Sequence, residues 1–146
     1  MENKLNNEFR TLMRNHRILV QDYLNKLNLY KGQPRILFVL EKSPEISQQK
    51  LSEVLNISKE ATSVSIRRLE KTGFIERREC SRDRRIKLLS LSDHGQKIVK
   101  ELRLNFDKID SYMFFDLEAD EQKELERLLL KMNKSLEKRL EDEKIV

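Results

Sequence analysis

The stretch SKEATSVSIRRLEKTGFIERRECSRDRRIKLLSL, residues 58–91, decides the fold, because a helix signal is followed at once by two strand signals. Ser58 is a suitable N-cap for the helix. Residues that would form the inward face of that helix are spaced three and four positions apart, at Thr62, Ile66 and Leu69. Gly73 suits the position after the helix, because glycine accepts the left-handed conformation common there.

Two strands are predicted after this helix, at residues 74–79 and 85–91. Their apolar alternation is imperfect, and the polar residues 80–84 between them lack the Asn-Gly or Asp-Gly signal of a tight hairpin. We nevertheless interpret the segment as a two-stranded wing.

A second short helix is predicted just before residue 58. Ser47 can cap it, and its apolar residues are Leu51, Val54 and Leu55. Asn56-Ile57 then makes a tight turn into the helix capped by Ser58. Two short capped helices joined by a turn of three or four residues form a helix-turn-helix.

Longer helices are predicted on both sides of this motif. The first carries an apolar stripe from Leu5 to Leu27 and ends near Gly32, and Pro34 lies in the first turn of a buried helix through residues 36–40. Ser92 caps a long helix, residues 116–120 interrupt it, and a last helix follows. The fold class is mainly α with a small β-wing, in one domain over residues 1–146: a winged helix-turn-helix at 33–91 and dimerisation helices at 3–31 and 92–144. We expect dimerisation because these terminal stripes look too extensive for the small core to cover.

Charge is concentrated in one window. The net charge is +5, and between Arg67 and Lys87 nine basic residues face four acidic ones, which accounts for the whole excess. Such a concentration is the footprint expected for phosphate binding, although a solvated, salt-bridged surface is the alternative. No apolar run reaches the roughly 18 residues of a membrane span and no signal segment is visible, so we expect a cytoplasmic protein without membrane partners.

The chain resembles the MarR (multiple antibiotic resistance regulator) family. RLEKTGFI at 68–75 is similar to the end of that family's recognition helix and its first wing strand, and Gln33 sits where the family often has Gln. The wing signature of the family is matched by Asp83, Arg85, Leu89, Leu91, Ser92 and Gly95. The resemblance implies a homodimeric, sequence-specific regulator of transcription, most often a repressor, that binds a pseudo-palindromic operator.

The resemblance also implies where double-stranded DNA would bind: the helix 58–72 in the major groove and Arg85 in the minor groove. The candidate recognition-helix residues are Ser58, Lys59, Glu60, Thr62, Ser63, Val64, Arg67 and Arg68, and the wing residues are Arg82, Asp83, Arg84 and Arg85. If Thr62 faces inward, then Glu60, Ser63, Val64 and Arg67 face outward. Asp83 is expected to orient Arg85 or Arg84. Many family members have Arg where this chain has Val64, which puts one base contact in doubt.

An effector site is implied only by the resemblance, because some family members bind small aromatic or phenolic ligands. Its candidate lining residues are Met13, His16, Arg17, Tyr30, Arg35 and Phe38, for each of which core packing is the alternative. No clustered ligand set predicts a metal, and no cofactor is expected. The basic surroundings of Cys80 could lower its pKa, which leaves redox sensing as a minor hypothesis.

Two other function classes are alternatives. A winged-helix module could instead place its basic wing on an acidic protein; Arg85→Ala would then leave duplex affinity unchanged. An enzyme is disfavoured, because no Gly-rich phosphate loop, nucleophile–base pair or paired carboxylates with a supporting context appear.

Overall fold

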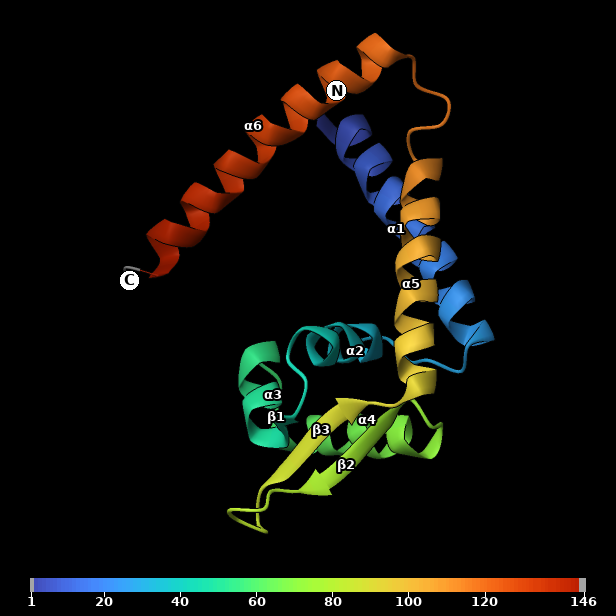
Figure 1. Cartoon of the computed structure of the whole chain (residues 1–146). Helices are drawn as coiled ribbons and strands as arrows, with labels where there is room; N and C mark the ends of the chain where they lie inside the picture. The colour runs from blue at the N-terminus through green and yellow to red at the C-terminus, as the bar shows by residue number, and fades with distance from the viewer. Residues whose placement is uncertain (1, 145–146) are drawn as a thin grey trace. The chain divides into compact units, whose positions relative to one another are not determined.

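The computed structural model describes residues 2–144 (Figure 1). Its elements, in chain order, are α1 (Glu2–Lys26), α2 (Gln33–Lys42), β1 (Ile46–Ser47), α3 (Gln48–Leu55), α4 (Lys59–Lys71), β2 (Ile75–Glu79), β3 (Lys87–Leu91), α5 (Asp93–Tyr112) and α6 (Ala119–Lys144). The predicted class, mainly helical with a small wing, is confirmed. None of the helices described between residues 2 and 144 is long and apolar enough to cross a membrane.

The chain divides into two compact units, Met1–Ile109 and Asp110–Val146. In the first unit, α2, α3, α4, the sheet and most of α5 share one hydrophobic core. Its most deeply buried side chains are Ile36, Leu37, Leu40, Leu51, Ile66, Leu69, Leu89 and Leu102. The prediction that α2 is central and buried is confirmed for Ile36, Leu37 and Leu40, whereas Phe38 and Val39 are half-buried.

The end of α1 corrects the sequence prediction, which extended this helix to residue 31. The helix ends at Lys26, because Asn28 adopts a left-handed conformation with φ 55°. The amide of Leu29 donates to the carbonyl of Leu24 over 3.0 Å, which closes the helix end. The buried side chain of Leu29, in the connection between α1 and α2, then joins the core.

The helix-turn-helix forms as predicted. The Ser47 hydroxyl accepts from the Lys50 amide at the start of α3, and the Ser58 hydroxyl accepts from the Ala61 amide at the start of α4, each over 3.0 Å. These caps satisfy amides that have no partner within their helices. Asn56, with φ 52°, makes the turn between the two helices.

The sheet has three antiparallel strands in the order β1-β3-β2. The predicted strands begin slightly later than expected, at Ile75 and Lys87. The sequence analysis did not predict β1, which pairs Ile46 with Leu89 and Ser47 with Leu88. A two-residue strand is too short to show alternation, so only its pairing with β3 identifies it.

Gly95 fixes how the first turn of α5 lies against the start of the wing. A Cβ atom at this position would lie 1.9 Å from the backbone oxygen of Phe74, so only glycine fits. The Ser92 hydroxyl accepts from the Gly95 amide over 3.0 Å and donates to the carbonyl of Gly73 over 2.5 Å. The predicted cap at Ser92 is thus confirmed, and it also ties α5 to the end of α4.

The second unit consists mainly of α6. An interruption between two helices is found, but at residues 113–118 instead of the predicted 116–120, and the Glu121 carboxylate accepts from the amide of Glu118 over 3.0 Å where α6 begins. Along the described helix α6, no side chain is buried. Its exposed apolar residues are Leu128, Leu130, Met132, Leu136 and Leu140.

Candidate functional site

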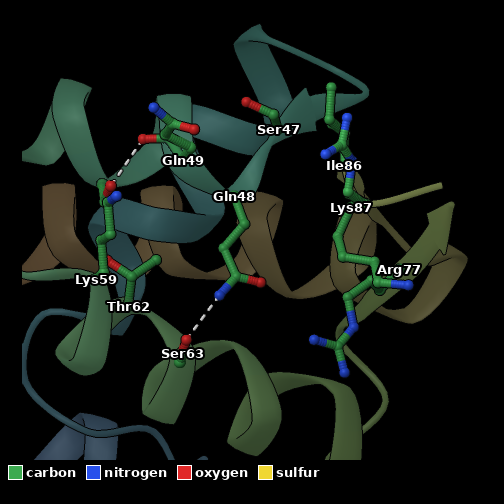
Figure 2. Close-up of a pocket in the computed structure, with 11 residues that line it drawn as sticks. Ser47, Gln48, Gln49, Lys59, Thr62, Ser63, Arg77, Ile86 and Lys87 are labelled. Atoms are coloured by element: carbon green, nitrogen blue, oxygen red, sulfur yellow. Dashed lines mark hydrogen bonds between the residues drawn. The ribbon is translucent and has the colours of Figure 1, made fainter. Parts of the chain in front are cut away.

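A polar pocket of about 460 Å³ lies where α3, α4 and the β2–β3 wing meet (Figure 2). It is lined by Ser47, Gln48, Gln49, Ser52, Lys59, Thr62, Ser63, Arg77, Arg85, Ile86 and Lys87. Four of these eleven residues are cations, and none of the eleven is a carboxylate. The pocket therefore suits an anionic ligand that also presents hydrogen-bonding groups.

The first two turns of α4 contribute part of this pocket. They do so because the opposite face of the helix is packed into the core. Because Thr62, Ile66 and Leu69 are buried in the core, the opposite face of α4 is presented outward. Glu60, Val64 and Arg67 are exposed, as expected, and Ser63 is half-buried at the pocket wall.

Two candidate contacts on α4 have other partners. Thr62 is fully buried, and its hydroxyl donates to the Ser58 carbonyl over 2.9 Å, so we remove it from the set of exposed contacts. The guanidinium of Arg68 lies 4.4 Å from the ring centre of Tyr30. This stacking accounts for Arg68 without a ligand.

The wing tip carries an ion pair that shows which arginine Asp83 orients, Arg84 or Arg85, a choice that the sequence left open. The Asp83 carboxylate accepts from the Arg85 backbone amide over 3.0 Å and from the guanidinium Nε over 3.2 Å. It therefore orients Arg85 rather than Arg84. These bonds hold the pKa of Asp83 below its ordinary value. The Arg85 side chain is 91% exposed, so it is oriented and still accessible. Arg82 and Arg84 are exposed beside it and lie outside the pocket lining.

Seven lining residues are not among the predicted site residues: Ser47, Gln48, Gln49, Ser52, Arg77, Ile86 and Lys87. The guanidinium of Arg77 lies 3.0 Å from the Glu70 carboxylate, and the ammonium of Lys87 donates to Glu79 over 3.0 Å. The basic window did contain Arg77 and Lys87, but only strand pairing shows that both line the pocket. The glutamines precede the window, and nothing in their spacing relates them to α4.

Cys80 lies half-buried at the end of the wing strand β2. Backbone amides of Arg82 and Asp83 lower the pKa of its thiol, and the charges of Arg78 and Arg82 act in the same direction. This agrees with the direction expected from its basic surroundings. Among residues 2–144, no three metal-ligating side chains gather closely enough to hold an ion.

The six candidate effector residues line neither the polar pocket nor either of two further pockets, both on the α6 side of the chain, within residues 2–144. Phe38 packs edge-on against Phe106, with ring centres 6.2 Å apart, and the Arg103 guanidinium lies 4.7 Å from its ring centre. Tyr30 lies under Arg68. Met13, Arg17 and Arg35 are exposed, and His16 is half-buried. An effector site at these residues stays a prediction.

Comparisons with known proteins agree with this fold. The MarR family model matches residues 29–87. The chain is 29% identical to the HTH-type transcriptional regulator BilQ of Clostridium symbiosum over 117 residues, 80% of this chain and 81% of BilQ. Among solved structures, YusO of Bacillus subtilis is similar with a TM-score of 0.84 at 20% identity, covering 91% of this chain and 94% of YusO. FabT of Streptococcus pneumoniae, in complex with DNA, has a TM-score of 0.72 at 20% identity, covering 94% and 99%.

Proposed function

Because the MarR family model matches residues 29–87, we propose that this chain is a transcription regulator of that kind and binds double-stranded DNA through α4 and the wing. We propose further that it acts as a homodimer on a pseudo-palindromic operator in the cytoplasm, as a repressor. The observation that carries the proposal is the pocket in which Ser63 and Lys59 of α4 meet Arg77, Arg85 and Lys87 of the wing.

The electrostatics of this surface support a duplex as the ligand. The pocket cations and the exposed Arg67, Arg82 and Arg84 can neutralise phosphates, while Ser63 and Val64 offer a polar and an apolar contact to base edges. In our proposal α4 enters the major groove, and the oriented, exposed Arg85 reaches the narrow minor groove. The solved structure of FabT in complex with DNA supports this use of the fold.

Unpaired apolar surfaces support the homodimer. Leu5 and Ile18 of α1, and Leu136 and Leu140 of α6, are more than half exposed in the single chain. Large exposed apolar side chains at helical spacing are typical of surfaces that another chain covers. In a symmetric dimer the two copies of α4 would read half-sites about one helical turn, roughly 10–10.5 base pairs, apart.

Release by a small aromatic or phenolic effector completes the proposal. It rests on the family resemblance and on the six residues given above, and its test is direct. Aromatic acids at millimolar concentration should shift the melting temperature and the duplex affinity; if they change neither, the effector part is abandoned.

The central experiment is selection of bound duplexes from a random pool at stated salt, followed by affinity measurements over a range of salt concentrations. Arg85→Ala should lower the affinity and reduce the slope of log K against log salt by about 1, because one phosphate-neutralising charge is lost. Arg127→Ala is the matched control. Arg127 is held by the Glu124 carboxylate as Arg85 is by Asp83, and it belongs to α6 and not to the pocket lining.

Arg85→Ala and Arg127→Ala remove the same charge, so the experiment separates the wing from general electrostatics. Equal effects of the two substitutions would contradict a wing contact. Binding of a single half-site with undiminished affinity would contradict the symmetric dimer, and failure to enrich any duplex at low salt would contradict DNA binding itself.

A further inference from the structure

One hydrogen bond crosses the pocket and joins the two helices of the helix-turn-helix. The side-chain amide of Gln48, in the first turn of α3, donates through Nε2 to the hydroxyl of Ser63 on α4 over 2.8 Å (Figure 2). Both side chains are half-buried in the pocket wall. The bond is therefore partly shielded from water while both groups remain next to the space that a ligand would fill.

The direction of this bond determines what Ser63 can do next. A serine hydroxyl has one proton to donate and two lone pairs that accept. Since its oxygen already accepts from Gln48, the hydroxyl proton of Ser63 is left to be donated to a ligand. A free serine offers its proton and both lone pairs, whereas Ser63 keeps its proton and one lone pair, so Gln48 favours donation by Ser63 to a ligand.

The backbone on both sides of the bond is held in place. Ser47 caps α3, and the Ser52 hydroxyl donates to the Gln49 carbonyl over 2.7 Å. Leu51 of α3 and Ile66 of α4 are fully buried in the core. Because neither helix can move without disturbing this packing, the position of the Ser63 hydroxyl is set before any ligand arrives.

The stripe of α4 that contains Ser63 faces the same way over three turns. Lys59 lies four residues before Ser63 and also lines the pocket, and Arg67 lies four residues after it. The guanidinium Nε of Arg67 donates to the Ser63 carbonyl over 3.4 Å. Two cations therefore flank the directed hydroxyl, where phosphates on either side of a base would be met.

We propose that Gln48 is a positioning residue for base recognition, which fixes Ser63 as a donor so that the pair selects a base presenting an acceptor in the major groove. This inference rests on the proposed function, since it requires α4 to enter the major groove of a duplex. Guanine, adenine and thymine each present an acceptor there, whereas the major-groove edge of cytosine presents an amino donor. At one position in each half-site, cytosine on the contacted strand should therefore be disfavoured.

The test compares the base preferences of variants selected from the same random duplex pool. In Gln48→Glu the carboxylate can only accept, so Ser63 must donate to it and turn its lone pairs to the DNA. The base disfavoured by the native protein should then gain about 3- to 10-fold relative to the others at that position. Gln49→Glu adds the same charge to the same pocket wall without touching Ser63, so it should weaken binding and leave the preferences unchanged.

Two further variants keep the test decisive if Gln48→Glu binds too weakly to be selected. Gln48→Ala frees the hydroxyl without adding charge, and should relax the discrimination at that single position. Ser63→Ala should remove it, and adding Gln48→Ala to Ser63→Ala should change the preference no further. A purely structural role for Gln48 would lower the affinity for all duplexes alike.

The outcomes separate this inference from the proposed function. If the native protein and both Gln48 variants select duplexes with the same preference at every position, the inference is overturned while DNA binding stands. If the native protein selects no duplex at all, the proposed function fails and the inference fails with it. A shift confined to the one position supports both.

Discussion

Helices α4 and α6 have similar amphipathic sequences, but the apolar face of α4 is buried in the structure and that of α6 is not. In α4 the inward residues Thr62, Ile66 and Leu69 are buried, and the outward face forms part of the candidate site. Along α6 the described residues include no buried side chain, and Leu136 is 64% exposed. An apolar stripe thus identifies the face of a helix that needs a partner, but it does not say whether that partner lies in the same chain.

The largest expected difference between these helices is in stability. Leu69→Ala should lower the free energy of unfolding by about 2–5 kcal/mol, because it leaves a cavity in a fully packed core. Leu136→Ala should change it by no more than about 0.5 kcal/mol in dilute solution, since the side chain is exposed. Urea denaturation measures both values, and equal losses would contradict the contrast between the helices.

A second test concerns the close packing of the first unit. Gly95→Ala should lower the free energy of unfolding by about 1–3 kcal/mol, because its Cβ would collide with the Phe74 carbonyl oxygen. Gln96→Ala, at the adjacent exposed position, serves as the control and should be close to neutral. If thermal denaturation gives the same midpoint for both variants, α5 does not approach the wing as closely as described.

The third test asks whether a second chain covers α6. Leu136→Glu should weaken the homodimer at least about tenfold, because a charge would be buried without a partner at the proposed interface. Lys138→Glu lies on the opposite side of the helix and introduces the same acid, so it should leave association nearly unchanged. Sedimentation equilibrium measures both, and a Leu136→Glu protein that associates like the native chain would remove α6 from the interface.

The smallest effect is expected at the exposed wing tip. The pKa of Asp83 is lowered in the folded chain, so its pairing with Arg85 persists above the ordinary aspartate pKa and is lost as pH falls through the lowered value. NMR titration of the Asp83 carboxyl should show this as a midpoint below that of an ordinary aspartate.

Asp83→Asn should accordingly reduce duplex affinity by no more than about fivefold, as expected for an exposed pair. Glu124→Gln breaks the comparable exposed pair on α6 and should leave duplex affinity unchanged. A larger loss with Asp83→Asn would mean that the carboxylate does more than orient Arg85.

Local signals were enough to predict much of the fold. Serines before apolar helices marked the starts of α3, α4 and α5, and the structure shows each of these caps. The end of α1 differs from the prediction because the chain reverses at a left-handed turn at Asn28, and of Leu27 and Leu29 only Leu29 lies just beyond it. Periodicity cannot register such a reversal, since it counts residues without knowing their backbone angles.

By itself, the sequence determined the order of the helices, the position of the wing and the gathering of positive charge between Arg67 and Lys87, because capping, periodicity and charge depend on neighbouring residues. Only the tertiary structure decided that Gln48 hydrogen-bonds to Ser63 and that Arg77 lines the same pocket. It also decided that Arg68 stacks on Tyr30. Those contacts join residues from different elements. They depend on how α3, α4 and the wing pack around a shared core, and no local pattern carries that information.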